Sequence, residues 1–363
     1  MQAQNSAIKP GELKYRIESG EKLLILDVRE REEYRDWHIK GSVNIPMKKI
    51  VGGSNLNIPK KEKIVTICMH GMRSEKARQI LADRGYNASV MQGGMIAWNS
   101  VYDISHVKEG NVNVVQFRRI GKGCMSYMIW NGKEALAIDP TIDVNVYAEF
   151  AEARKLRIVG VFDTHAQADH VSGGYELSKI ANTGYFGPKE LGNKIKYKIV
   201  NEDSRIAFGD AELLAMGTPG HTPSSTTYLV EDIAFTGDTL FVESVGRPDL
   251  GQDASSNAAI LWETLHGKFL NLSSDIRIFP THYSDKVEIV PGIPVYASMA
   301  ELKQRLRALS MGKNEFIEWV AKNTPLKPNN FGLIKKINKG LIKIQDEGEL
   351  RDLEAGPNRC AVK

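Results

Sequence analysis

Several features that are diagnostic of particular protein classes are scarce in this sequence. Its 363 residues include only three cysteines, Cys68, Cys124 and Cys360, an odd and sparse set that makes a poor disulfide framework. No apolar run approaches the roughly 18 residues that span a bilayer, and the first residues lack the apolar core of a signal peptide. We therefore expect a reduced, cytoplasmic protein that does not enter a membrane.

An excess of charge of one sign is also missing. The 48 basic and 44 acidic residues leave a formal net charge of +4, which argues against a nucleic-acid partner but allows a local anion site. Hydrophobic residues make up 42% and charged residues 25%, an ordinary globular balance. At about 150 residues per domain, the length indicates two domains, with room for an extension.

The first part of the chain alternates strand-like and helical segments, which predicts an α/β fold with a doubly wound, mostly parallel sheet. In the second part, strand-like runs come in groups, which predicts two packed sheets with helices outside them. The polar residues 100–111 lack periodicity and are interpreted as a linker. After residue 297 we expect an amphipathic helix and then a basic, loop-rich stretch. The predicted segments are 1–104, 105–298 and a C-terminal helical extension, 299–363, that packs on the second domain.

Cys68 ends an apolar strand and comes just before a predicted helix over 74–86. A thiol at a helix N-terminus meets unpaired backbone N–H groups, which favour the nucleophilic thiolate. Gly71 lets the loop curl into an anion nest, and Arg73 adds a fixed positive charge. This pattern fits a cysteine that carries a persulfide. A buried core cysteine and a phosphatase with Cys-x4-Arg are the alternatives.

The motifs around this loop resemble, in their order, those of a single rhodanese domain spanning residues 10–100. By that resemblance Cys68 is the sulfur-carrying nucleophile and Arg73 belongs to its anion-binding loop. An alternative makes the domain a sensor or docking module without activity. Asp27 and Trp98 are interpreted as structural. The matching segments are 26–34, 38–46, 68–74 and 91–98, and the remaining loop residues are Met69, His70, Gly71, Met72 and Ser74.

Histidines and aspartates follow apolar strands in the second part of the chain. Residues at strand ends gather along one rim of a sheet, and several such side chains together predict a metal site. For each histidine taken alone, a hydrogen-bonded structural role is the alternative. Cys124 and Cys360 are interpreted as incidental. The candidate metal residues are His165, Asp169, His170, His221, Asp238 and His282.

These segments resemble the ordered motifs of the metallo-β-lactamase superfamily, which implies an αββα sandwich. Gln167 stands where the usual first motif has its second histidine, a departure that weakens a fully occupied two-zinc site. His165, His221 and Asp238 remain for one metal. Two imidazoles and one carboxylate with open positions are typical of non-haem iron(II) that activates oxygen.

Within this superfamily, the chain most resembles the persulfide dioxygenase branch, and residues 242–250 and 326–338 carry that resemblance. That branch implies one Fe²⁺ held by His165, His221 and Asp238. It also implies glutathione persulfide and O₂ as substrates, sulfite as product, and an oligomer. With the rhodanese site, sulfite and a persulfide would give thiosulfate.

By the same resemblance, three further residues either orient the metal ligands or form a second metal site. These residues are Asp169, His170 and His282. Arg247 lies where the branch has an arginine close to the site, and a structural salt bridge with Asp249 is its alternative. For the whole chain, the alternative is a zinc-dependent thioester hydrolase of the glyoxalase II type, in which metal-bound hydroxide attacks.

Overall fold

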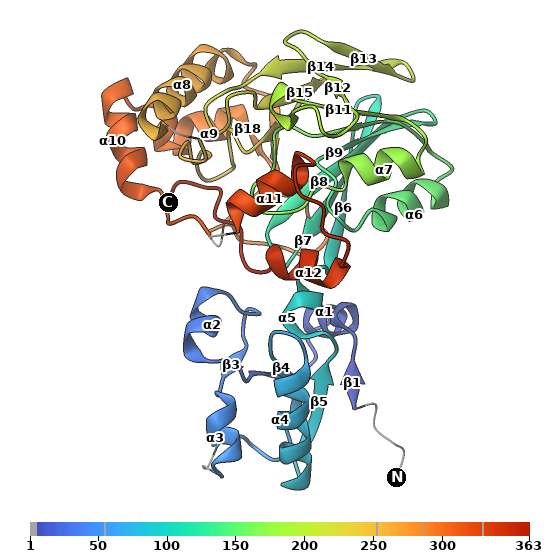
Figure 1. Cartoon of the computed structure of the whole chain (residues 1–363), viewed down its shortest axis with the longest axis vertical. Coiled ribbons are helices and arrows are strands. Elements are labelled where there is room, and N and C mark those ends of the chain that lie inside the picture. The colour runs from blue at the N-terminus through green and yellow to red at the C-terminus, as the bar shows by residue number, and fades with distance from the viewer. Residues whose placement is uncertain (1–5, 54–55, 252, 285, 329) are drawn as a thin grey trace. The chain divides into compact units, whose positions relative to one another are not determined.

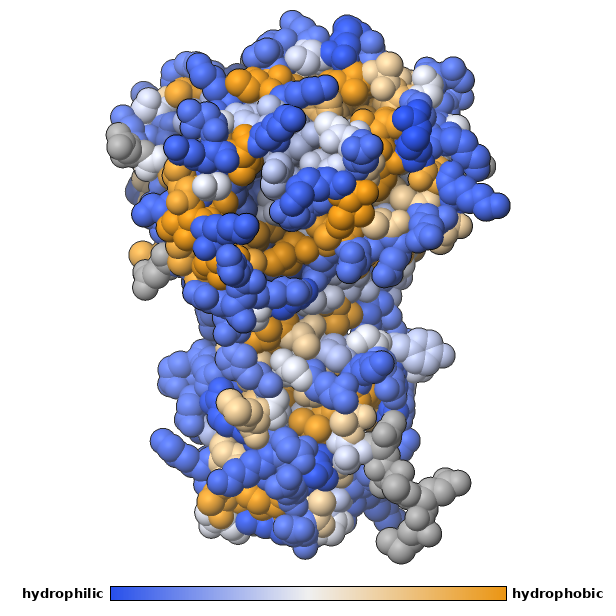
Figure 2. Space-filling view, turned by 45° about the vertical axis from the view of Figure 1, so that its right-hand side comes forward, coloured by the Kyte–Doolittle hydropathy of each residue, from blue (hydrophilic) through white to orange (hydrophobic). Residues whose placement is uncertain are grey.

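The computed structural model describes residues 6–53, 56–251, 253–284, 286–328 and 330–363. The chain divides into two compact units (Figure 1). Within the described ranges, no helix is long and apolar enough to cross a bilayer. On the face shown in Figure 2, hydrophobic patches interrupt a largely hydrophilic surface. Unit 1 comprises Met1–Asp103, Arg119–Lys122 and Ala355–Pro357, and unit 2 comprises Ile104–Arg118, Gly123–Glu354 and Asn358–Lys363.

Unit 1 is built on a five-stranded parallel sheet in the order β1-β5-β4-β2-β3. Leu13 and Met95 lie in one buried cluster, while Ile50 and Leu81 lie in another. Because helices supply both clusters, the sheet is covered on both faces, as the doubly wound prediction requires. The strands are β1 (Ala7–Ile8), β2 (Leu24–Asp27), β3 (Val43–Asn44), β4 (Lys63–Ile67) and β5 (Asn87–Met91), and the helices are α1 (Pro10–Glu18), α2 (Arg31–Asp36), α3 (Met47–Val51), α4 (Met72–Asp83) and α5 (Gly94–Trp98).

Unit 2 contains two sheets that pack on a shared hydrophobic core. The first has seven strands in the order β12-β11-β10-β9-β8-β7-β6, and the second has six in the order β13-β14-β15-β16-β17-β18. The first sheet consists of β6 (Tyr102–Glu109), β7 (Val112–Arg119), β8 (Cys124–Asn131), β9 (Glu134–Ile138), β10 (Arg157–Phe162), β11 (Gly184–Gly187) and β12 (Lys198–Ile199), and the second of β13 (Arg205–Phe208), β14 (Ala211–Gly217), β15 (Thr226–Val230), β16 (Ile233–Gly237), β17 (Arg277–Pro280) and β18 (Ala297–Ser298).

Helices lie outside both sheets of unit 2 (Figure 1). Helices α6 and α7 pack against strands β10 and β11 of the first sheet, and α8 packs with α10 beside the second. This arrangement is the predicted αββα sandwich. The helices are α6 (Asn145–Ala153), α7 (Gly174–Ile180), α8 (Ala254–Gly267), α9 (Met299–Arg305), α10 (Lys313–Asn323), α11 (Phe331–Asn338) and α12 (Glu347–Leu353).

Two parallel strand pairs, one in each sheet, bring the metal motifs to one rim. Strand β9 pairs with β10, and β16 pairs with β17. Because parallel strands end at the same edge of a sheet, the residues that follow them meet there. Asp139 follows β9, His165 follows β10, Asp238 follows β16 and His282 follows β17.

Two local predictions need correction. The first boundary between the units falls within the expected linker, 100–111, but this segment contains strand β6, whose buried positions include the polar Asp103 and Ser105. Polar residues on the inward face hide the alternation of apolar residues that marks a strand. The amphipathic segment after residue 297 breaks into α9 and α10, and the stretch expected to be loop-rich forms α11.

Candidate functional site

The side chains of His165, His221 and Asp238 meet in the interior of unit 2. Each is about 1% exposed, and one ligand atom from each lies within 4.8 Å of the others. The Nε2 atoms of both histidines lie 3.6 Å from Oδ2 of Asp238. The three residues come from three different loops, so the tertiary fold assembles this group.

A backbone carbonyl group fixes the orientation of the His221 ring. Its Nδ1 donates to the carbonyl oxygen of Arg247 at 2.8 Å, which leaves a lone pair on Nε2. The backbone at Gly246 lies very close to the backbone at Asp238. A Cβ on Gly246 would lie 1.8 Å from the carbonyl oxygen of Asp238. Only glycine fits at that position, which begins the sequence Gly-Arg-Pro-Asp over residues 246–249.

A carboxylate that the sequence analysis missed orients His165. The Thr164 hydroxyl donates to Oδ2 of Asp139 at 2.9 Å, and its oxygen lies 2.9 Å from Nδ1 of His165. Asp139 also accepts from Thr281 at 2.7 Å. Asp139 follows the apolar run of β9 just as Asp238 follows β16, so the same signal could have found it.

The charge states and free atoms of this group suit a divalent metal. Burial, opposed by the Asp238 carboxylate, lowers the pKa of His165 to about 3. Burial alone would raise the pKa of Asp238, but His282 and His165 hold it below its ordinary value. Neutral imidazole and ionised carboxylate are the forms that bind metal. Among the described residues, His221 Nε2 and Asp238 Oδ2 are buried with no hydrogen-bond partner, as expected of atoms that face a metal.

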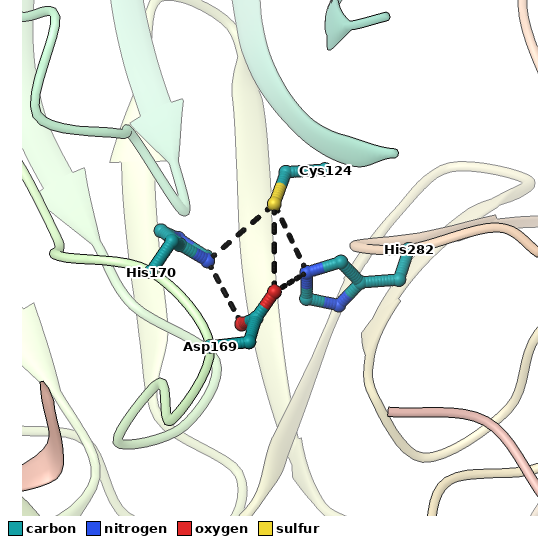
Figure 3. Close-up of side chains that lie close together, drawn as sticks. All are labelled: Cys124, Asp169, His170 and His282. Atoms are coloured by element: carbon teal, nitrogen blue, oxygen red, sulfur yellow. Dashed lines mark hydrogen bonds and ion pairs between the residues drawn. The ribbon is translucent and has the colours of Figure 1, made fainter. Parts of the chain in front are cut away.

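Figure 3 shows a second group of buried side chains, which consists of Cys124, Asp169, His170 and His282. His282 stands between two carboxylates, with Nδ1 2.6 Å from Oδ1 of Asp238 and Nε2 2.8 Å from Oδ2 of Asp169. The His170 Nδ1 lies 3.0 Å from Asp169, and the Cys124 thiol lies 3.2 Å from His282. The two groups therefore share a hydrogen-bonded network.

Neighbouring acidic groups raise the pKa values of both histidines in this second group. Burial would lower the pKa of His282, but Asp169 and Asp238 raise it well above its ordinary value. Burial is likewise overcome at His170, where Cys124 and Asp169 raise the pKa to about 10. Near neutral pH these imidazolium rings balance the buried negative charges, and a metal there would have to displace their protons.

In unit 1, the loop after β4 surrounds the Cys68 thiol with donors. The backbone N–H groups of Gly71 and Ser74 donate to its sulfur at 3.2 and 3.3 Å, and the Ser74 hydroxyl lies 3.3 Å away. The N-terminus of α5 holds the loop from the other side, because Met95 N–H donates to the Cys68 carbonyl at 2.8 Å. A Cβ on Gly94 would lie 2.3 Å from that carbonyl, so this approach requires glycine.

The Arg73 side chain forms a bidentate ion pair with Glu33 at 2.7 and 2.8 Å. The hydrogen bond to Glu33, opposed by partial burial, raises the pKa of Arg73. Its guanidinium is therefore anchored beside the loop through Glu33.

Two family models match the chain. The rhodanese-like domain model matches residues 9–101, and the metallo-beta-lactamase superfamily model matches residues 119–282. The chain joins a rhodanese-like domain to a metallo-beta-lactamase domain. The first contains the Cys68 loop and the second contains both histidine groups.

Curated relatives match the metallo-beta-lactamase part. The mitochondrial persulfide dioxygenase ETHE1 of Homo sapiens is 32% identical over 154 residues, which cover 41% of this chain and 59% of that protein. The hydroxyacylglutathione hydrolase of Francisella tularensis subsp. novicida is 30% identical over 161 residues, covering 43% of this chain and 61% of that protein. The chain thus spans less than two thirds of the length of these relatives.

Solved structures agree on the fold. A metallo-beta-lactamase from Staphylococcus aureus subsp. aureus COL has a TM-score of 0.60 at 26% identity, covering 65% of this chain and 76% of that chain. ETHE1 from Myxococcus xanthus has a TM-score of 0.55 at 23% identity, covering 66% of this chain and 98% of that chain.

Within the metallo-beta-lactamase domain, the structure places Gln167 and Arg247 in structural contacts. The Gln167 amide donates to Oδ1 of Asp139 at 3.1 Å. The Arg247 guanidinium is fully buried, pairs with Asp249 at 2.6 and 2.9 Å, and donates to the carbonyl oxygens of Arg359 and Pro325. These contacts favour the salt-bridge alternative for Arg247 over contact with substrate.

The structure brings together six predicted metal residues and adds two cysteines. Cys124 lies in the second group, and Cys360 lies within 4.8 Å of Asp238 and His282. The interpretation of both as incidental rested on their isolation in the sequence, where no neighbouring motif marks them. Their ligand or catalytic roles, like those of the predicted residues, stay predictions.

Proposed function

We propose that the metallo-beta-lactamase domain is a persulfide dioxygenase with one iron held by His165, His221 and Asp238. The observation that carries this proposal is a buried group of two neutral imidazoles and one carboxylate, in which His221 Nε2 and Asp238 Oδ2 have no hydrogen-bond partner. A low-molecular-weight persulfide such as glutathione persulfide would react with O₂ and water to give the thiol and sulfite. Bound ferrous iron would supply open coordination positions and electrons for oxygen.

This chain's own residues orient that centre and balance its charge. Thr164 and the Arg247 carbonyl fix the two histidine rings with Nε2 inward. His282 shares its protons with Asp238 and Asp169, which keeps the adjoining carboxylates paired. The burial of the group keeps bulk water away from a reactive persulfide.

The rhodanese-like domain would supply or use the same sulfur. The Cys68 thiolate, stabilised by the Gly71 and Ser74 N–H groups, would take the outer sulfur of a donor and hold it as a persulfide. Its transfer to sulfite gives thiosulfate, and its transfer to glutathione gives the dioxygenase substrate. Fusion in one chain raises the local concentration of the shared intermediate in both cases.

One experiment tests the dioxygenase. The purified protein is loaded anaerobically with Fe²⁺, and oxygen uptake is recorded on addition of glutathione persulfide, with sulfite measured as product. We expect oxygen uptake that depends on iron and disappears in His221→Ala. Two tightly bound zinc ions, no oxygen uptake and cleavage of a glutathione thioester would establish the hydrolase instead.

The hydrolase is the second candidate because two observations favour it. The relatives include hydroxyacylglutathione hydrolases, and Asp169, His170 and His282 adjoin the first group as a second metal site would require. Gln167 argues against it, because an amide replaces an imidazole of the two-zinc motif.

A further inference from the structure

The C-terminal part of unit 2 contacts the loops that carry His165, Asp238 and His282. We call the residues that do so the C-terminal strap. It consists of the side chains of Asn338, Glu354 and Asn358 and the backbone of residues 359–362. All are far along the chain from the loops that they contact.

Asn338, at the end of α11, uses its whole amide on the loop after β10. Its Nδ2 donates to the carbonyl oxygens of Gln167 at 3.0 Å and His170 at 2.9 Å, and its Oδ1 accepts from the Ser172 N–H at 2.9 Å. The side chain is buried, with 8% exposed. These three bonds bracket Asp169 and His170.

Glu354, which follows α12, contacts the same loop. Its Oε2 accepts from the Val171 N–H at 2.9 Å, and the residue is fully buried. The loop over residues 163–171 has neither helix nor strand. Its backbone groups therefore depend on partners such as Asn338 and Glu354 rather than on regular structure.

The rest of the strap contacts the loops that carry Asp238 and His282. The Asn358 amide donates to the carbonyl oxygen of Tyr283 at 2.8 Å, next to His282. The Arg247 N–H donates to the Cys360 carbonyl at 2.8 Å, and the Val362 N–H donates to the Val245 carbonyl at 3.0 Å. The carbonyl that orients His221 belongs to this same Arg247.

We propose that the strap residues Asn338 and Glu354 are positioning residues that preorganise the metal centre. Metal affinity then depends on two side chains that are not themselves metal ligands. The physical reason is that a metal fixes its ligands within a few tenths of an ångström, whereas an unsupported loop would lose conformational entropy on binding. The strap restricts the loop before metal arrives. The proposal rests on the metal centre described above but not on its reaction.

The test measures metal affinity instead of turnover. Metal-free protein is titrated with Co²⁺ against a chelator, and the visible absorption of the bound ion reports its coordination. The unfolding midpoint of the metal-free protein is recorded for each variant. The variants are Asn338→Ala, Glu354→Ala and Glu354→Gln. Asn323→Ala is the matched control, because that amide caps the end of α10 by donating to Trp319 O.

We expect Asn338→Ala and Glu354→Ala to weaken Co²⁺ binding by about 10-fold or more and to change its absorption, as loss of outer-shell support does elsewhere. Glu354→Gln keeps an acceptor for the Val171 N–H and is expected to retain the wild-type absorption. Asn323→Ala is expected to bind as the wild type does, even where its unfolding midpoint falls.

Wild-type affinity and absorption in both alanine variants would overturn the proposal. An equal loss of affinity in Asn323→Ala would also overturn it, because the effect would then follow general stability. If the wild type itself bound no metal, the metal centre would be refuted as well. Tight metal binding without oxygen uptake would refute only the proposed dioxygenase.

Discussion

The Nδ1 atom of His221 lies 2.8 Å from the carbonyl oxygen of Arg247, and this contact joins the metal centre to the Gly-Arg-Pro-Asp loop. A carbonyl can only accept, so the ring is held with its proton on Nδ1 and its lone pair on Nε2. The Arg247 side chain meanwhile pairs with Asp249. One residue thus orients a histidine with its backbone and secures its loop with its side chain.

Removal of His221 tests the ligand set directly. We expect His221→Ala to lose bound iron, because only one imidazole and one carboxylate of the first group would remain. Metal content after anaerobic loading and desalting measures this. His266→Ala is the control, because His266 bonds to Trp262 O within α8. Full iron occupancy in His221→Ala would show that the ligand set is wrong.

Thr164 links Asp139 to His165, and its removal should loosen one ligand without deleting it. Thr164→Val keeps the shape but loses the hydroxyl between Asp139 Oδ2 and His165 Nδ1. We expect metal affinity to fall by about 10- to 100-fold. Competition with a chelator measures this, and unchanged affinity would mean that Asp139 does not support His165.

Cys68 should be needed for sulfur transfer and not for oxygen chemistry. We expect Cys68→Ser to abolish thiosulfate:cyanide sulfurtransferase activity, because a hydroxyl cannot form the persulfide. Oxygen uptake with glutathione persulfide serves as the internal control and should be largely unchanged. Retained sulfurtransferase activity would make Cys68 irrelevant to the chemistry and favour the docking-module alternative.

The raised pKa of Asp163 predicts that the free energy of unfolding depends on pH. Burial, reinforced by Asp139, raises the pKa of Asp163 from 3.8 to about 7, and its Oδ1 is buried without a hydrogen-bond partner. The folded protein therefore binds this proton more tightly than the unfolded chain does. The contribution stabilises fully below the ordinary pKa of 3.8 and is lost as the pH rises through about 7.

Urea unfolding of the wild type and Asp163→Asn across that range provides the measurement. The amide mimics the neutral acid, so we expect the difference in free energy of unfolding between the two proteins to shift in favour of the variant as the pH rises. A difference that stays constant between pH 4 and about 7 would contradict the raised pKa.

Both domains and most of the candidate site could be predicted from the sequence. The Cys68 loop and the histidine motifs are local patterns, in which strand, turn and reactive side chain are close together in the chain. Parallel strands end at one edge, so a residue after each strand was enough to predict that His165, Asp238 and His282 would meet. The strand β6 escaped prediction because its inward positions include Asp103 and Ser105.

The sequence by itself determined which residues could bind metal and sulfur and along which sheet edge they would gather. Only the tertiary structure decided which residues support them. Asp139 reaches His165 through Thr164, Cys124 joins the second histidine group, and Asn338 holds a carbonyl 171 positions earlier in the chain. No periodicity or spacing records such contacts, because they arise when distant segments are packed together and their buried polar groups must find partners.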